Sequence, residues 1–255
     1  GDFAGALRHG IAACEREFLA TGKDSGACLV VGLLVGGGIS GAEREGVAAT
    51  RPRRLVVANV GDCRAVLASL DGRTVRQITK DHKPGDPEEH KRVEDAGGRI
   101  FVGRLFGIIA VARSVGDAQL KGDGPGGTAL SPIPDIFEIT LSDDGCGVAE
   151  GGDGKKGEPE SGDGVLVLAC DGVWDELTNE QVAQKAAEGL AKGAKRAARK
   201  LASIKAAGDA TAARVRDPGA HLAARQIVSS AAETGYDDCT AVVVPLCRRP
   251  RTSET

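Results

Sequence analysis

The sequence predicts an α+β domain, in which helices lie beside layered β-strands. Short apolar runs alternate with glycine-rich breaks, as strands and turns do, before helical periodicity takes over toward the end of the chain. With 255 residues, 41% of them hydrophobic, the chain is long enough to bury a sizeable core. We therefore expect a single domain over residues 1–255.

Six apolar runs bounded by turn residues are predicted as strands: residues 28–35, 55–60, 64–70, 107–112, 165–170 and 240–246. The second and third runs are separated only by the sequence GDC. A link of this length predicts that these two strands pair as an antiparallel hairpin. The sequence DGR then leads into TVRQIT, which predicts a further strand of the same meander.

Three stretches have the periodicity of amphipathic helices. The first spans residues 6–20, and its apolar face comprises Leu7, Ile11, Cys14 and Phe18. The second has apolar residues at positions 190, 194, 197, 201 and 204 and an opposite face with Lys192, Lys195, Arg196, Arg199 and Lys200. The third covers about residues 220–233 and turns inward Ala224, Ile227, Val228 and Ala231. We interpret the basic face as a solvated helix surface rather than a membrane or anionic-partner site.

Segments of glycine and charge interrupt this pattern. They are predicted to be flexible insertions near residues 36–54, 121–130 and 142–164, because they contain little that a core could bury. The net charge is −3, and no basic stretch contains interleaved aromatic residues, so nucleic acid is not an expected partner. The longest apolar run is too short and too rich in glycine to span a membrane.

The seven cysteines form no CxxC pair and are odd in number. This pattern favours reduced thiols in an intracellular protein, in the cytoplasm or nucleus, over a disulfide or zinc framework. The first residues lack the features of a signal peptide, and the chain begins without methionine. We therefore expect that it was processed or cut.

Acidic residues stand at the edges of the apolar runs. Asp171 ends the fifth run and Asp175 follows four positions later, Asp237 and Asp238 precede the sixth run, and Asp117 follows the fourth. Each one alone could be a helix cap or a turn residue. Carboxylates gathered at one end of a sheet, however, repel one another unless a cation holds them. Since carboxylates suit hard divalent cations, the pattern favours Mg²⁺ or Mn²⁺.

Five stretches resemble successive motifs of the metal-dependent type 2C protein phosphatases. They are ANVGDCRAVL (58–67), ITKDHKPGDPEEHKRVEDAGGRI (78–100), GIIAVARSVGD (107–117), LACDGVWDEL (168–177) and YDDCTAVVV (236–244). Their order and spacing fit over nearly the whole chain. The resemblance implies two antiparallel β-sheets packed as a sandwich with helices on the outer faces. It also implies phosphoserine or phosphothreonine in proteins as the substrate, and we expect the chain to be a monomer.

The resemblance further implies metal-binding roles for four aspartates. Asp171 and Asp237 would bind a centre of two Mg²⁺ or Mn²⁺ ions, and Asp117 and Asp175 would help to hold a third, weaker ion. Two such ions polarise a phosphate and lower the pKa of a shared water, which makes hydroxide available near neutral pH. Trp174 and His82 are assigned to structure rather than to catalysis.

The chain also departs from the family pattern. The sequence contains no strand ending in Asp-Gly-His-Gly-Gly, the motif whose aspartate bridges both ions and whose histidine protonates the leaving group, and it lacks the earlier arginine that grips the phosphate. We expect an N-terminal truncation rather than an evolved loss. The sandwich would then be incomplete at its N-terminus, with no catalytic residue identified and weak or absent activity. Asp238 and Phe106 occupy positions where the family usually has asparagine.

Two other functions are compatible with particular features. A phosphatase-like fold that binds a partner without hydrolysing it is the main alternative, and an upstream Asp-Gly-His-Gly-Gly segment would argue against it. The sequence GGGISG at 36–41 fits a dinucleotide-binding GxGxxG motif, and Asp62 follows at a compatible distance. The residues between them make a poor helix, which argues against an oxidoreductase.

Overall fold

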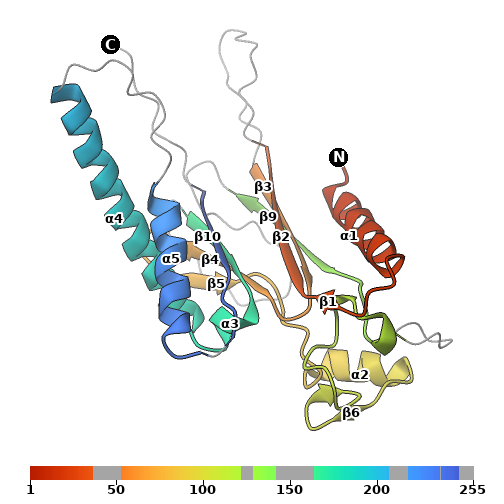
Figure 1. Ribbon diagram of the computed structural model, residues 1–255. Coiled ribbons are helices and arrows are strands. Elements are labelled where there is room, and N and C mark those ends of the chain that lie inside the picture. Colours follow the sequence, from red (N-terminus) through yellow and green to blue (C-terminus); the bar gives the residue numbers. More distant parts are fainter. Residues whose placement is uncertain (37–52, 122–128, 142–163, 207–217, 236, 247–255) are drawn as a thin grey trace. The chain divides into compact units, whose positions relative to one another are not determined.

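The computed structural model describes residues 1–36, 53–121, 129–141, 164–206, 218–235 and 237–246 (Figure 1). The three predicted insertions lie almost entirely outside these residues. The chain divides into two compact units whose sequences are interleaved. One comprises Gly1–Val35, Arg54–Ala65 and Ile78–Ile139, and the other comprises Gly36–Arg53, Val66–Gln77 and Thr140–Thr255. The expectation of one domain stays a prediction.

The first unit contains a three-stranded sheet with one helix packed against it. The strands are β2 (Leu29–Val35), β3 (Arg53–Val60) and β9 (Asp135–Leu141), and β3 lies in the middle. β2 and β3 are antiparallel, with Leu29 opposite Val60 and Val35 opposite Arg54. The helix α1 (Phe3–Leu19) buries Ile11 against Ala58 and Val60 of β3. The predicted helix at 6–20 and the predicted strands at 28–35 and 55–60 are confirmed.

The remaining part of this unit is built from short elements around α2 (Pro87–Asp95). The strands are β1 (Gly26–Ala27) paired with β8 (Val115–Gly116), and β6 (Ile100–Phe101) paired with β7 (Arg104–Leu105); a 3₁₀ turn, η1, covers Ala118–Leu120. The helix α2 was not predicted. Its start is nevertheless explicable, because the Asp86 carboxylate caps it by accepting the N–H groups of Glu88 and Glu89.

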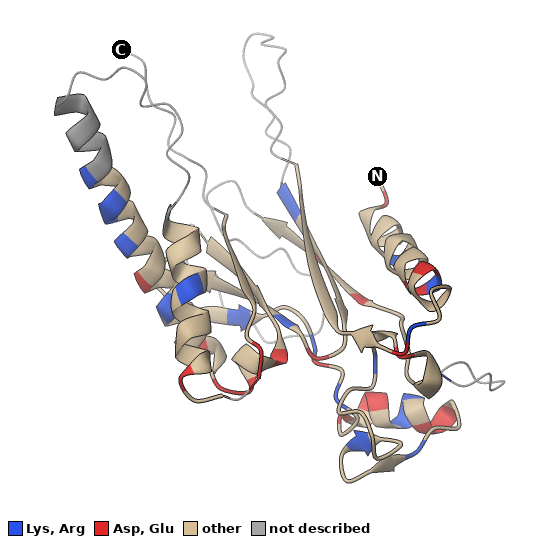
Figure 2. Cartoon of the chain, in the orientation of Figure 1, with Lys and Arg blue, Asp and Glu red and all other residues tan. Residues whose placement is uncertain are grey.

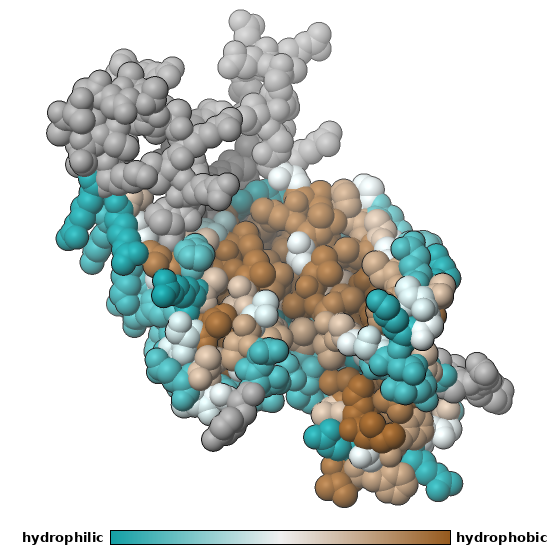
Figure 3. All heavy atoms as spheres, viewed as in Figure 1, coloured by the Kyte–Doolittle hydropathy of each residue, from teal (hydrophilic) through white to brown (hydrophobic). Residues whose placement is uncertain are grey.

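The hairpin of β6 and β7 exposes apolar side chains. Val102 is fully exposed at its tip with a positive φ of 50°, and Phe101 and Ile108 are more than half exposed. Figure 3 shows the corresponding brown surface over the hairpin. A β-branched residue in the left-handed region is uncommon and reflects the tightness of this turn.

The second unit contains a four-stranded sheet in the order β11-β10-β4-β5. These strands are β11 (Ala241–Pro245), β10 (Gly164–Ala169), β4 (Arg64–Ser69) and β5 (Val75–Gln77). Its helices are α3 (Asp171–Trp174), α4 (Asn179–Ala206) and α5 (Pro218–Ala232). α4 and α5 lie against the sheet, where Val182 and Ile227 join Val167 in one core cluster. Trp174 is buried in this cluster, which confirms its packing role.

The predicted hairpin of the strands at 55–60 and 64–70 is wrong, because β3 and β4 belong to different sheets. Both edges of each strand are occupied: β3 lies between β2 and β9, and β4 lies between β10 and β5. The link between them bonds to His82 instead of closing a hairpin. The Gly61 N–H donates to His82 Nδ1 at 3.1 Å, and the Gly61 oxygen accepts the His82 N–H at 3.0 Å. The predicted continuation into β5 is confirmed.

The predicted strand at 107–112 is also wrong. Phe106 and Gly107 both have positive φ, 56° and 72°, so the chain turns where the strand was expected to begin. After this turn, Ile109 makes only an isolated bridge to Leu105. The apolar residues of this segment belong to a loop, in which Val111 and Ala112 pack against Val93 of α2.

The long helix α4 extends toward its start beyond the predicted apolar positions and buries the predicted face in part, because Leu190 packs against the core cluster and Ala197 is half-buried. Its buried positions include Val182, Ala186, Gly189 and Gly193, whereas Ala194, predicted to face the core, is exposed. The predicted basic face is exposed at Lys192, Lys195, Arg196 and Arg199. The helix α5 agrees better with its prediction, because Ile227 and Ala231 are buried.

Candidate metal-binding site

Strands β10 and β11 bring Asp171 and Asp237 to the same end of one sheet. The two strands are antiparallel, and their last matched pair is Ala169 with Ala241. The pairing continues one step further, because the Cys170 N–H donates to the Thr240 oxygen at 3.2 Å. The residues that follow β10 and those that precede β11 therefore lie together.

Gly172 allows these two segments to approach closely. A Cβ atom added to Gly172 would lie 2.5 Å from the Asp238 oxygen and 3.5 Å from the Asp237 Cβ. Any side chain at this position would push the backbone before β11 away from α3. Glycine is therefore a steric requirement of the site.

The carboxylates are oriented by the backbone next to them. Asp171 is half-buried at the start of α3, and its Oδ1 accepts the Gly172 N–H at 3.0 Å. Asp237 is exposed, and its Oδ1 accepts the Asp238 N–H at 2.7 Å. One turn of α3 separates Asp171 from the exposed Asp175. Figure 2 shows acidic segments in red at α3 and in the chain between α5 and β11.

Two cysteines form hydrogen bonds between the same two segments. The Cys170 thiol donates to the Asp238 oxygen and its sulfur accepts the Thr240 N–H, both at 3.2 Å. The Cys239 thiol donates to the Gly172 oxygen, also at 3.2 Å. Burial raises the pKa of the Cys239 thiol above its ordinary value, and the nearby Cys170 and acidic groups raise it further.

Asp117 belongs to the other unit, so its predicted place beside Asp171 stays a prediction. Its φ of 54° lies in the left-handed region, and its Oδ2 accepts the Ser114 hydroxyl at 2.7 Å. The Asp117 N–H donates to the Ser25 oxygen at 2.7 Å. A Cβ at Gly26 would collide with the Asp117 carboxylate. These contacts fix Asp117 firmly in the turn after β8.

The chemistry of Asp171 and Asp237 fits a hard divalent cation. Both offer carboxylate oxygens, and Mg²⁺ is usually held by only one or two protein carboxylates, together with water and substrate phosphate. Among the described residues, no group of three or more histidine, cysteine, aspartate or glutamate side chains is arranged to hold a metal ion. The assignment of four aspartates as ligands therefore stays a prediction.

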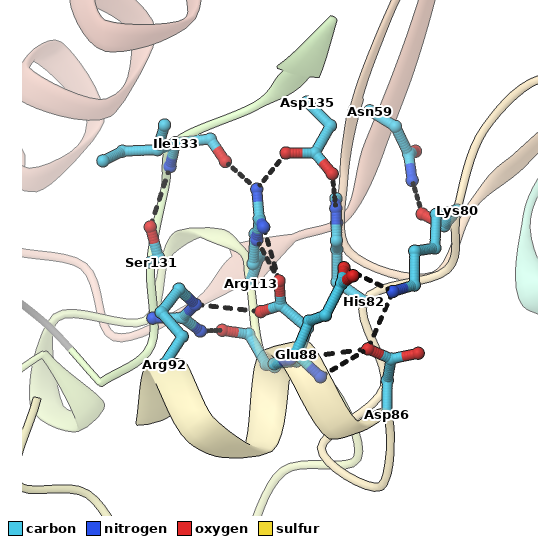
Figure 4. Close-up of polar contacts among 12 residues, drawn as sticks. Asn59, Lys80, His82, Asp86, Glu88, Arg92, Arg113, Ser131, Ile133 and Asp135 are labelled. Carbon is cyan, nitrogen blue, oxygen red and sulfur yellow. Dashed lines mark hydrogen bonds and ion pairs between the residues drawn. The ribbon is translucent and has the colours of Figure 1, made fainter. Parts of the chain in front are cut away.

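A polar network in the first unit was not anticipated from the sequence (Figure 4). The Arg113 guanidinium donates to Glu89 Oε1 at 2.9 Å and to Asp135 Oδ1 at 2.7 Å. Arg92 donates to the other Glu89 oxygen at 2.9 Å. His82 is fully buried, and its Nδ1 accepts a backbone N–H. Its Nε2 therefore carries the proton and donates to Asp135 Oδ2 at 3.1 Å.

This network strongly favours the ionised carboxylates. The hydrogen bond from His82, followed by the contacts with Arg113, lowers the pKa of Asp135 to about 2. Burial opposes the ionisation of Glu89, but Arg113 and Arg92 hold the pKa of its carboxyl below the ordinary value. The network thus joins α2, the loop before β8 and the start of β9.

Asp62 is a further acid that the sequence analysis considered only for a dinucleotide site. It lies on the link after β3, is almost fully buried and forms an ion pair with Lys83 at 2.6 Å. Burial of a carboxylate is costly unless the group is paired. The sequence signal was its place directly after a buried strand, the same signal that marked Asp171.

The sequence matches one protein-family model and several curated proteins. A family model described as "Protein phosphatase 2C" matches residues 40–212. The chain is 38% identical over 128 residues to "Probable protein phosphatase 2C 27" of Arabidopsis thaliana, a match that covers 50% of this chain and 28% of that protein. It is 34% identical over 149 residues to "Protein phosphatase 1A" of Homo sapiens, with 56% and 34% covered. The chain thus spans about a third of the length of these curated relatives.

A solved structure described as a phosphatase from Toxoplasma gondii shares the fold. Its TM-score is 0.57 at 18% identity, and the match covers 93% of this chain and 66% of that one. The likeness, together with the antiparallel sheets and their helices, confirms the expected α+β class. Since the family model covers well over half of the sequence, this chain belongs to the protein phosphatase 2C family.

Proposed function

We propose that this chain is part of a metal-dependent protein phosphatase that hydrolyses phosphoserine and phosphothreonine in proteins. The observation that carries the proposal is the approach of the Asp171 and Asp237 segments at one end of the β10–β11 pair, in a chain of the 2C family. Two similar proteins are themselves named as protein phosphatases. Phosphorylated proteins are accordingly the proposed partners.

Asp171 and Asp237 would hold Mg²⁺ or Mn²⁺ in a binuclear centre, and Asp175 and Asp117 would contribute to a third, weaker site. The ions, when bound, polarise the phosphate and supply hydroxide near neutral pH. The chain's own groups orient the carboxylates: Gly172 and Asp238 each donate a backbone N–H to one of them. Gly172 also lets the two segments approach closely, as a shared ion would require.

A noncatalytic binding module is the second candidate. It is favoured by Asp238 and Phe106 at positions where the family usually has asparagine. Such a module would bind phosphorylated proteins without releasing phosphate.

For the location, we propose the cytoplasm or nucleus, and for the assembly a monomer. The described cysteines are all free thiols, which suits a reducing compartment. In the part of the chain that the structure describes, no helix is long and apolar enough to cross a membrane.

The test is phosphate release from a phosphothreonine peptide in the presence of Mn²⁺. We expect slow, metal-dependent release that is lost in Asp171→Ala and Asp237→Ala but kept in Asp95→Ala, a control on the exposed surface of α2. A chain extended upstream to include an Asp-Gly-His-Gly-Gly segment should be faster by about 10²- to 10⁴-fold, the usual contribution of a general acid.

Two results would contradict the proposal. Equal rates with and without the upstream segment would show that the missing motif is dispensable and that the catalytic centre lies elsewhere. Binding of the phosphopeptide in calorimetry, without phosphate release from either chain, would favour the noncatalytic module.

A further inference from the structure

Asp117 is held in an uncommon conformation by the groups around it. Its backbone has a φ of 54° and a ψ of 47°, in the left-handed region that few residues other than glycine adopt. An aspartate directly before a helical turn usually accepts an N–H of that turn, yet the Asp117 carboxylate accepts none from η1. It is turned toward the Ser114 hydroxyl instead, which donates to its Oδ2 at 2.7 Å.

A buried ion pair fixes the chain on both sides of this turn. The side chains of Glu15, on α1, and Lys121 are only 9% and 5% exposed, and Lys121 Nζ lies 2.6 Å from Glu15 Oε1. The second Glu15 oxygen accepts the Gly116 N–H at 2.7 Å. Lys121 Nζ also donates to the Ser114 backbone oxygen at 2.8 Å. The pair therefore holds the residue before Asp117 and the residue whose hydroxyl binds Asp117.

Stability alone does not explain a buried ion pair at this position. Removing two charges from water is costly, and an apolar pair of similar volume is often as stable or more so. Burial accordingly lowers the pKa of Lys121, while Glu15 and Asp117 favour its charged form. Apolar side chains could also join α1 to this turn, but they would offer no acceptor to Gly116 and no donor to Ser114. The charged pair adds hydrogen bonds of fixed direction.

We propose that Glu15, Lys121 and Ser114 are positioning residues for the third, weaker ion site. They hold the Asp117 carboxylate away from the N–H groups of η1 and in the orientation that binds the ion. Ser114 uses Oδ2, and the carboxylate is then available to Mg²⁺ or Mn²⁺, which prefer such oxygens. The inference rests on the proposed function, because it takes Asp117 as a metal ligand.

Binding of Mn²⁺ to the full chain, measured by the electron paramagnetic resonance signal of the free ion, tests this inference. We expect the wild type to bind the ion in a tighter and a weaker class, and Asp117→Asn to lose the weaker class. Ser114→Ala and Glu15→Gln should each lower the affinity of the weaker class about 10- to 100-fold, as the loss of groups that orient metal ligands typically does. The matched control is Glu17→Gln, an exposed acid on α1, which should change neither class.

A double variant separates positioning from a general loss of stability. Glu15→Gln added to Asp117→Asn should bind Mn²⁺ as Asp117→Asn does alone, because the group that Glu15 positions is already gone. A merely structural role would weaken the tighter class as well. Circular dichroism checks that each variant is folded. If Glu15→Gln does not fold, Ser114→Ala decides the question, since it leaves the ion pair in place.

The outcomes distinguish a failure of this inference from a failure of the proposed function. Wild-type affinity of the weaker class in folded Ser114→Ala or Glu15→Gln would overturn the inference, as would equal weakening of both classes. If Asp117→Asn keeps both classes, Asp117 is not a ligand. If the wild type binds no Mn²⁺, the proposed metal centre fails. In these last two cases the inference falls together with the function on which it rests.

Discussion

At the scale of single residues, Gly172 sets the distance between the two candidate ligand segments. We predict that Gly172→Ala destabilises the chain by about 1–3 kcal/mol, the usual cost of overpacking, because the new Cβ would lie 2.5 Å from a backbone oxygen that cannot rotate away. Urea unfolding measures the change. The control is Gly10→Ala in α1, where a Cβ meets nothing within 4 Å and alanine should stabilise the helix by about 0.5–1 kcal/mol. Equal stability of Gly172→Ala and wild type would contradict the steric argument.

Asp135 gives the first unit a pH-dependent source of stability. Its pKa is lowered from 3.8 to about 2, so the ionised form is favoured in the folded state. The resulting stabilisation is fully present above the unfolded value and is lost as pH falls through the folded value. We predict that the difference in unfolding free energy between wild type and Asp135→Asn is largest above pH 4 and shrinks toward pH 2.

The measurement is urea unfolding of both proteins at about pH 5 and about pH 2.5. The matched control is Glu138→Gln on the same strand, whose ion pair with Arg54 is exposed and 3.6 Å long. A difference between wild type and Asp135→Asn that does not change over this range would show that His82 and Arg113 do not favour the ionised carboxylate.

The sequence predicted the position of a residue in the fold where a local pattern marked that residue. An apolar run that ends in an acid placed Asp171 at a sheet end, and the structure has it there, next to the residues before β11. No local pattern marks the ion pair of Glu89 and Arg113, because 24 positions separate them in the sequence. Their partnership depends on tertiary structure.

At the scale of elements, length and periodicity predicted most helices and strands but not how the strands pair. The GDC link suggested a hairpin, yet His82 holds the link by two hydrogen bonds and its two strands enter different sheets. The strand β9 was missed because Asp135 begins it and Glu138 interrupts its apolar run. The strand propensities of single residues reveal neither how β3 and β4 pair nor that β9 exists. Both depend on which strands lie next to these segments.

The contact of α4 with α5 depends on another glycine. A Cβ at Gly189 would lie 2.5 Å from the Ala223 nitrogen, so the two helix backbones approach directly at this point. We predict that Gly189→Ala destabilises the chain by about 1–3 kcal/mol, although alanine is the better helix former. Thermal unfolding compared with the Gly10→Ala control separates the two effects. A stabilised Gly189→Ala would show that α4 and α5 can separate without cost.

At the scale of the whole molecule, the sequences of the two units are interleaved. The second unit takes residues 66–77 from the middle of the first, and these residues form most of β4 and all of β5. β4 is the direct neighbour of β10, which bears the fully buried Val165 and Val167 and leads to Asp171. The candidate site therefore depends on a strand from a distant part of the chain.

This arrangement predicts that residues 140–255 do not fold on their own, although they contain all of α4 and α5. Without β4, one edge of β10 has unpaired backbone groups and the core cluster loses Val66 and Ala68, which favours aggregation over a native sheet. We expect circular dichroism to show helix in this fragment but no cooperative unfolding. Fusing residues 64–77 to its start through a flexible linker should restore a cooperative transition, because β4 can again pair with β10. A cooperative transition in the unfused fragment would mean that the helices and the β10–β11 pair suffice, and the role assigned to β4 would be wrong.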